Sequence, residues 1–218
     1  MSASDQDSEL LDAYRSLKVP IVSHDRDAPL FGDIVRLDHF NGVVGALNYL
    51  FDLGHRRIGI IAGDVSVRPG RERLRAFREA HLARGINIDE RLVRLGRFSA
   101  ESGLTEASSL LGFSPRPTAI IAGGASILPG TLQALRLHGL GVGRDISLVA
   151  CGTSDLAEHG TPRITTVHWD YANLGDTSAR LLLDRIVQKA DMPARHLMFP
   201  TQLVIRESCR AINEAHSR

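Results

Sequence analysis

Short apolar runs alternate with longer stretches of helical periodicity along most of the chain. The apolar runs carry few polar residues, which is typical of strands that are buried on both faces. They predict strands at Val19–His24, Ile58–Ala62, Leu92–Leu95, Ala119–Ala122, Ile146–Cys151 and Thr165–His168. The helical patterns lie at residues 8–17, 41–53, 71–84, 101–111, 127–138 and 172–188, and a last strand is predicted around Gln202–Ile205.

This order of elements predicts an α/β fold. Strands that are separated by helices pair in parallel through right-handed crossovers, so helices cover both faces of the sheet. Gly54, Gly85 and Gly139 follow three of the predicted helices, where glycine ends a helix well. In such a sheet, ligands bind beyond the carboxyl ends of the strands.

Composition narrows the class of protein further. The 218 residues are 43% hydrophobic and 23% charged, with a formal net charge of +1, which is ordinary for a globular protein and too little for a dedicated nucleic-acid surface. Two cysteines, Cys151 and Cys209, cannot form a disulfide framework, and no Cys/His spacing resembles a metal site. We therefore expect no metal and no cofactor. No signal peptide or membrane span is recognisable, so we expect a cytoplasmic protein that does not contact membranes.

Two segments after predicted strands carry candidate binding residues. Arg71, Arg75 and Arg78 share one face of the predicted helix and form a solvated surface, whereas Arg73 stands apart and is free to point into a cleft. Phe98 comes just after the strand at Leu92–Leu95, where its ring could stack on a sugar or purine, or simply join the core. No Gly-x-Ser-x-Gly elbow or metal-spaced His/Glu motif is present, so we expect no catalytic residues and no enzyme.

The sequences of six segments resemble motifs of the lactose/galactose repressor (LacI/GalR) family of bacterial transcriptional regulators. They run in the family's order over most of the chain: Gly54-His55-Arg56-Arg57-Ile58, Arg73-Leu74-Arg75-Ala76-Phe77, Pro117-Thr118-Ala119-Ile120, Asp145-Ile146-Ser147-Leu148-Val149, Pro162-Arg163-Ile164-Thr165-Thr166-Val167 and Pro200-Thr201-Gln202-Leu203-Val204-Ile205-Arg206. Each motif is modest alone, and their shared order and spacing carry the resemblance.

The resemblance implies a periplasmic-binding-protein-like (type I) effector core of two lobes that are joined by three crossovers. Residues 1–36 plus 171–190 would form an incomplete N-terminal lobe, residues 37–170 plus 191–210 the C-terminal lobe, and residues 211–218 a tail. Family members carry a DNA-binding headpiece and further strands in front of this segment. We therefore expect a remnant N-terminal lobe of one strand and two helices, with apolar surface left exposed.

The resemblance also implies three ligand contacts. Asp25 would accept hydrogen bonds from a ligand, Arg73 would donate to it, and Phe98 would stack on it. Two positions depart from the family pattern. Gly124-Ala125 stands where the family has Asn-Asp, and Gly152 stands where it has Asp, so hydrogen-bonding groups are lost from one side of the cleft.

The implied function is that of an effector-sensing, dimerising core of a repressor. Its partners would be a small carbohydrate or related polar effector, a second copy of the chain in a homodimer, and operator DNA only through a headpiece missing from this chain. The alternatives are a solute-binding protein of the same fold and a ligand-free dimerisation module. An α/β enzyme comes last.

Overall fold

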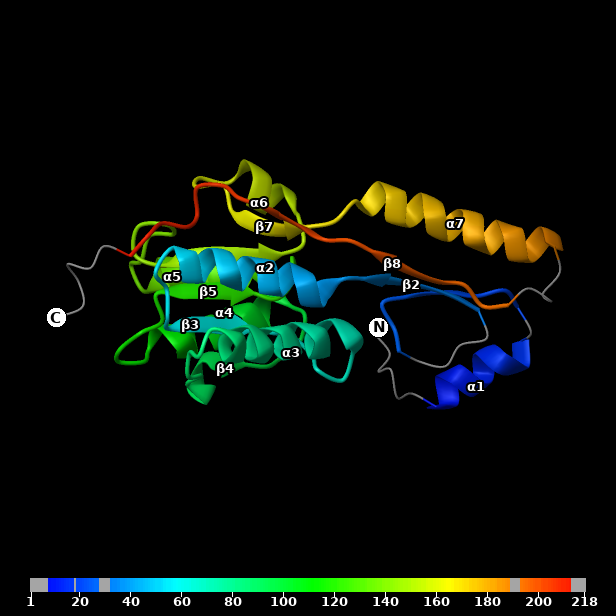
Figure 1. Cartoon of the computed structure of the whole chain (residues 1–218), viewed down its shortest axis with the longest axis horizontal. Coiled ribbons are helices and arrows are strands. Elements are labelled where there is room, and N and C mark those ends of the chain that lie inside the picture. The colour runs from blue at the N-terminus through cyan, green and yellow to red at the C-terminus, as the bar shows by residue number, and fades with distance from the viewer. Residues whose placement is uncertain (1–7, 18, 28–31, 189–192, 213–218) are drawn as a thin grey trace.

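The computed structural model describes residues 8–17, 19–27, 32–188 and 193–212. It contains two sheets, each with helices packed beside it (Figure 1). Residues 1–7 lie outside the described residues, and so do residues 213–218, which are most of the expected tail. No helix in the described ranges is long and apolar enough to cross a membrane.

The larger sheet has six strands in the order β4-β3-β5-β6-β7-β9. All neighbours pair in parallel except β7 and β9, which are antiparallel. Its strands are β3 (Ile58–Ile61), β4 (Val93–Arg94), β5 (Ala119–Ala122), β6 (Ser147–Cys151), β7 (Thr165–His168) and β9 (Gln202–Val204). Together with its helices, this sheet forms what we call the large lobe, residues 38–169 and 200–212.

Helices cover both faces of the larger sheet. On one face lie α2 (His39–Asp52) and α3 (Arg68–Ala83); on the other lie α4 (Ala100–Leu111) and α5 (Leu128–Leu137). The chain also forms a short 3-10 turn, η1 (Glu90–Leu92), and the helix α6 (Asp155–His159). Along β5, Ala119 and Ile121 face the first helix pair while Ile120 and Ala122 face the second, as the two-residue period of a strand requires. Both faces are apolar, which explains the unbroken apolar runs.

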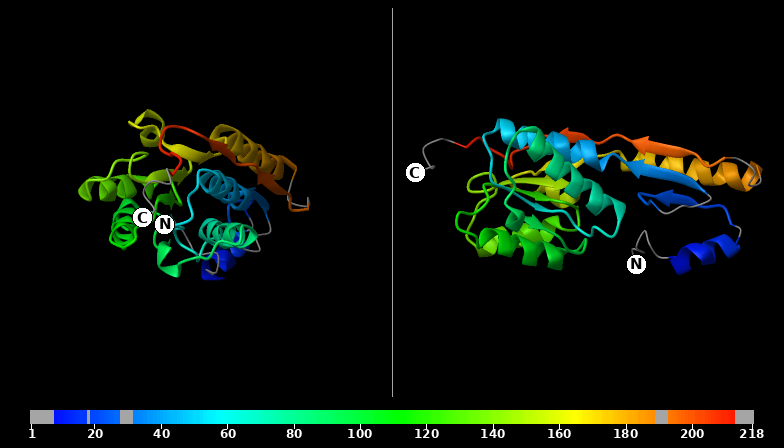
Figure 2. Two further views of the ribbon diagram at one scale, coloured as in Figure 1. Left: turned by 60° about the vertical axis from the view of Figure 1, so that its left-hand side comes forward. Right: turned by 60° about the horizontal axis from the view of Figure 1, so that its bottom comes forward.

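The smaller sheet has three parallel strands, β1 (Val22–His24), β2 (Asp33–Leu37) and β8 (His196–Phe199), in the order β1-β2-β8. The helices α1 (Ser8–Leu17) and α7 (Tyr171–Gln188) lie on opposite sides of it (Figures 1 and 2). We call these five elements the small lobe. The buried carboxylate of Asp33 joins β2 to α7 and to the segment before β8, since it accepts hydrogen bonds from Arg185 of α7 and from Arg195.

Two expectations about the small lobe are wrong. It has three strands rather than one, because β2 and β8 were both missed. The lobe boundaries also differ, because residues 191–210 were assigned to the larger lobe whereas β8 pairs with β2 of the smaller sheet. The expected two-lobed, periplasmic-binding-protein-like α/β architecture with parallel sheets is confirmed.

The chain crosses between the lobes three times. It passes from β2 to α2 at Asp38, from β7 to α7 at Trp169–Asp170, and from β8 to β9 at Pro200–Thr201. Two of the crossings are hydrogen-bonded to each other, because the Asp38 amide donates to the Phe199 carbonyl at 2.9 Å and the Thr201 hydroxyl donates to the Asp38 carbonyl at 2.9 Å. The crossing after β7 lies beside the third one, because His168 pairs with Gln202. The lobes are therefore joined by three adjacent connections.

Candidate functional site

A pocket of about 410 Å³ lies where the two lobes meet. The small lobe contributes the end of β1, and the large lobe contributes α3 and the segments that follow β4, β5, β6 and β7. The helices after β3 and β5 cover opposite faces of the sheet, so the pocket sits at the switch point where open α/β sheets bind ligands. Its volume suits a small molecule.

Arg73 lies in the wall of this pocket and is only 4% exposed. Its Nη1 donates to the Gly123 carbonyl just after β5, and its Nη2 lies 3.3 Å from Nδ1 of His39. The third donor, Nε, has no hydrogen-bond partner among the described residues. Burial lowers the pKa of the guanidinium, but arginine remains charged at neutral pH.

His39 links Arg73 to Asp25 across the lobe boundary. Its Nε2 lies 2.9 Å from Oδ2 of Asp25. A guanidinium can only donate and a carboxylate can only accept, so Nδ1 accepts from Arg73 and Nε2 donates to Asp25. Burial, reinforced by the charge of Arg73, lowers the pKa of His39, which keeps the ring neutral in this arrangement. Both ring nitrogens are occupied, so His39 is not placed to act as a general base.

Asp25 is held in place by several donors. Its Oδ1 accepts from the Leu37 amide at 2.9 Å and from Arg68 Nη1 at 3.1 Å. Burial alone would raise the pKa of Asp25, but the hydrogen bond and charge of His39, the Leu37 amide and Arg68 outweigh it and lower the pKa. Asp25 also adopts a φ of 52°, a conformation that side chains rarely take. This residue therefore holds the two lobes together as well as lining the pocket.

Three aromatic rings line the remaining wall. Phe98, which follows β4, lies under the guanidinium of Arg73, with 5.5 Å from Cζ to the ring centroid. Trp169 and Tyr171 follow β7, and their ring centroids are 5.2 Å apart. Trp169 is buried and its indole Nε1 has no hydrogen-bond partner among the described residues. The pocket is therefore lined by apolar ring faces, and two of its lining residues, Arg73 and Trp169, carry a buried N–H without a partner among the described residues.

Small residues leave room for these rings. A Cβ at Gly124 would lie 3.1 Å from Phe98, and one at Gly152 would lie 3.1 Å from Trp169 and 3.2 Å from the Tyr171 hydroxyl. Gly152 also has a φ of +93°, which glycine adopts without strain. Aromatic side chains therefore occupy the space that a larger residue at Gly124 or Gly152 would need.

The structure brings together the three residues that the sequence singled out, since Asp25, Arg73 and Phe98 all line this pocket, as do Gly124 and Ala125. Their roles in binding stay predictions. The expected separation of Arg73 from its neighbours also holds, because Arg75 and Arg78 are largely exposed. Sequence reasoning missed four residues of the site: His39, Arg68, Trp169 and Tyr171. The last two directly follow the predicted strand Thr165–His168, and that position could have identified them.

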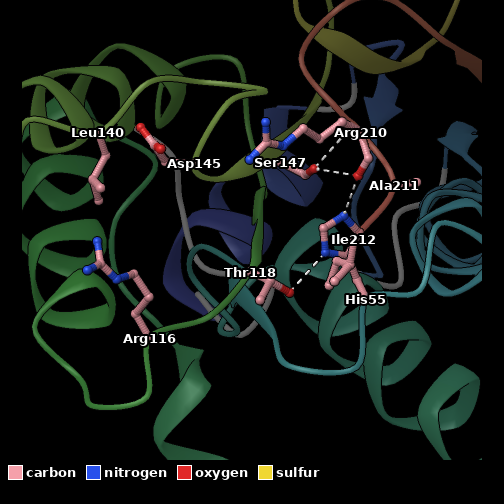
Figure 3. Close-up of a pocket in the computed structure, with 9 residues that line it drawn as sticks. All are labelled: His55, Arg116, Thr118, Leu140, Asp145, Ser147, Arg210, Ala211 and Ile212. Carbon is pink, nitrogen blue, oxygen red and sulfur yellow. Dashed lines mark hydrogen bonds between the residues drawn. The ribbon is translucent and has the colours of Figure 1, made fainter. Parts of the chain in front are cut away.

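A second cavity, of about 450 Å³, lies at the amino ends of β3, β5 and β6 (Figure 3). Here His55 contacts the Thr118 hydroxyl at 2.9 Å and donates from Nε2 to the Arg210 carbonyl at 3.1 Å. Ser147 accepts from the Arg210 amide at 3.1 Å. These polar groups bind the C-terminal segment to the sheet and satisfy one another. The described residues contain no group of side chains that could hold a metal ion.

Two α/β lobes with a pocket at their junction define a ligand-binding core of the periplasmic-binding-protein type. The chain belongs to the family described as periplasmic binding protein-like domain, whose model matches residues 47–209. The expected resemblance to the effector-binding core of LacI/GalR regulators is confirmed by the relatives that follow.

The HTH-type transcriptional regulator CelR of Thermobifida fusca is 38% identical over 174 residues, which are 80% of this chain and 51% of CelR. The HTH-type transcriptional repressor PurR of Escherichia coli O1:K1 is 34% identical over 199 residues, which are 91% of this chain and 58% of PurR. A solved CelR–cellobiose complex has a TM-score of 0.85 and 34% identity, covering 93% of this chain and 62% of that one. The chain spans just over half the length of these curated relatives, which are transcriptional regulators and not enzymes.

Proposed function

We propose that this chain is the effector-sensing, dimerising core of a LacI-type transcriptional repressor. The observation that carries the proposal is the hydrogen-bonded chain from Arg73 through His39 to Asp25, which spans the lobe boundary in the wall of the pocket. A ligand in this pocket touches both lobes at once, so its binding energy depends on how the lobes are arranged.

The mechanism is a shift in the populations of two lobe arrangements. A ligand that binds one lobe arrangement more tightly raises the population of that arrangement, and the ratio of its affinities for the two arrangements limits the size of the shift. In a homodimer, this changes how two DNA-binding headpieces are presented to a palindromic operator. Those headpieces would lie outside this chain. The CelR–cellobiose complex supports a carbohydrate or related polar ligand. The relatives, which are transcriptional regulators, support a binding role rather than a catalytic one and a place in the cytoplasm.

A thermal-shift screen of the purified chain against sugars, sugar acids, sugar phosphates, polyols and purines tests the proposal. A ligand that binds only the folded state raises the melting temperature. We expect at least one class to do so, and we expect Arg73→Met and Phe98→Ala to abolish the shift. Arg75→Met is the matched control, because Arg75 lies on the same helix but outside the pocket and pairs with Glu72 and Glu79.

The outcomes separate the alternatives. A shift that survives both pocket variants would place the ligand elsewhere. No shift with any class, from a chain whose circular dichroism and melting show it to be folded, would contradict a sensor and leave a ligand-free dimerisation module.

A further inference from the structure

The guanidinium of Arg73 is a buried charge that no carboxylate contacts among the described residues. Its hydrogen-bond partners are the Gly123 carbonyl and the neutral ring of His39. Buried charges in proteins are normally paired, because removing an ion from water costs several kcal/mol, by order of magnitude, without a counterion. The pocket wall therefore carries an excess of positive charge.

Among the described residues, Asp25 supplies the carboxylate of the pocket wall, and it already has partners. Asp25 forms an ion pair with Arg68 at 3.1 Å, and it receives further hydrogen bonds from the Leu37 amide and from His39. Arg68 also lies 3.5 Å from Asp27, outside the pocket lining. The imidazole of His39 stands between Asp25 and Arg73, so Arg73 has no carboxylate partner of its own among the described residues.

The rest of the wall offers donors and apolar rings but few strong acceptors. Gly124 and Ala125 of the lining carry no polar side-chain atom, and neither does Gly152 beside Trp169. The hydroxyls of Ser126 and Tyr171 are weaker acceptors than a carboxylate, and the indole N–H of Trp169 has no acceptor among the described residues. A neutral sugar hydroxyl donates as well as accepts, so it gains most where carboxylates can receive its proton. An oxyanion only accepts, and its hydrogen bonds to a guanidinium are among the stronger ones in proteins.

We propose that the effector carries an oxyanion, a carboxylate or a phosphate, that pairs with Arg73 while its ring packs against Phe98 and the Trp169–Tyr171 pair. This inference rests on the proposed sensing function and specifies its ligand as an acidic one. It differs from the neutral disaccharide in the solved CelR complex.

Matched pairs of ligands test the proposal in isothermal titration calorimetry on the complete chain at neutral pH. D-glucuronate against D-glucose, and D-galacturonate against D-galactose, each differ by a carboxylate in place of a hydroxymethyl group. D-glucose 6-phosphate separates a phosphate from a carboxylate, and cellobiose serves as the neutral reference. We expect at least one acidic ligand to bind about ten-fold or more tightly than its neutral counterpart.

The role of Arg73 is tested by charge removal. Arg73→Met should bring the affinities of the acidic and neutral partners within about two-fold of each other, whereas Arg75→Met should keep the preference. If Arg73→Met fails to fold, the matched pairs on the unaltered chain still decide the question.

Three results distinguish this inference from the proposed function. A neutral sugar that binds at least as tightly as every acidic ligand overturns the acidic effector and leaves the sensing function standing. An acidic ligand whose preference is unchanged in a folded Arg73→Met variant overturns the assignment to Arg73. A folded chain that binds no ligand of any class overturns the sensing function and this inference together.

Discussion

The buried charges of Asp33 and Arg73 differ in whether oppositely charged side chains contact them. Asp33 in the small lobe is 0% exposed, and its carboxylate receives Arg185 at 2.6 Å and Arg195 at 2.8 Å. The Arg195 amide donates to the same carboxylate at 2.8 Å. Arg73 at the pocket has no such counterion among the residues that the structure describes. Asp33 is paired within the protein itself, whereas Arg73 would gain its anion from the acidic effector that we propose.

Replacing Asp33 by Asn should destabilise the small lobe. The variant would remove the carboxylate of Asp33 from Arg185, and breaking a buried pair in this way costs about 3–5 kcal/mol. Hydrogen exchange followed by mass spectrometry should show faster exchange across α7 and β2, with the large lobe little changed. Asp184→Asn is the control, because Asp184 contacts Arg195 but is partly exposed. Equal effects of the two changes would argue against a special role for the buried carboxylate.

The same residue predicts a dependence on pH. Burial alone would raise the pKa of Asp33, but the hydrogen bonds from Arg185 and Arg195 outweigh it and hold the pKa well below its usual range. In the unfolded chain, the carboxyl group of Asp33 has an ordinary pKa of about 4. The folded state therefore gains stability from this carboxylate above about pH 4, and it loses that stability as the pH falls below about 4. The unaltered protein should therefore lose stability more steeply than Asp33→Asn in urea titrations below about pH 4.

Among the secondary-structure elements, two glycines in helices should respond oppositely to alanine. A Cβ at Gly130 of α5 would lie 2.4 Å from the Leu104 amide of α4 and closer still to the Ala100 carbonyl, whereas one at Gly45 of α2 would meet nothing within 4 Å. Gly130→Ala should lower the free energy of unfolding by about 1–3 kcal/mol through overpacking. Gly45→Ala should raise it by about 0.5–1 kcal/mol through helix propensity. Urea denaturation of both variants checks the contrast, and equal signs would contradict it.

The strands of the large sheet could be predicted because both of their faces are apolar. The missed strands lack that pattern. The charged residues Asp33 and Arg36 interrupt the apolar pattern of β2, and most of β8 is exposed. These short strands exist because they pair with each other, and pairing between residues 34 and 196 leaves no local trace.

The candidate site was predictable to the same extent. Arg73 and Phe98 follow predicted strands, and strand ends are where ligands bind. The ion pair between Asp25 and Arg68 was not predictable, because the two residues lie 43 positions apart along the chain. His39 was missed with the strand β2 that precedes it. Contacts within a segment can be inferred from sequence patterns, whereas contacts between segments require the fold.

At the scale of the whole molecule, the small lobe is the less protected part. Leu183, Ile186 and Val187 on α7 and Met198 on β8 are all more than half exposed. Apolar side chains in such numbers on one small unit indicate a surface that is incompletely covered. The large lobe, in contrast, buries two clusters of apolar side chains against its sheet.

Limited proteolysis should therefore remove parts of the small lobe first. With chymotrypsin at low dose, we expect early cleavage in α7 and around β8, because locally weak regions open more often. Mass spectrometry of the time course identifies the cuts. An effector that binds between the lobes should slow these cuts, while cleavage at equal rates throughout both lobes would contradict the difference in packing.

The three adjacent crossings between the lobes determine which kinds of motion the molecule permits. A single linker would let two bodies slide, twist and separate, but three short connections side by side suppress sliding and separation and leave mainly rotation of one lobe against the other. We therefore expect the lobes to move chiefly as a hinge. Ligands of different shape would then all act by changing the angle between the two lobes, and they would differ in whether that angle opens or closes and by how much.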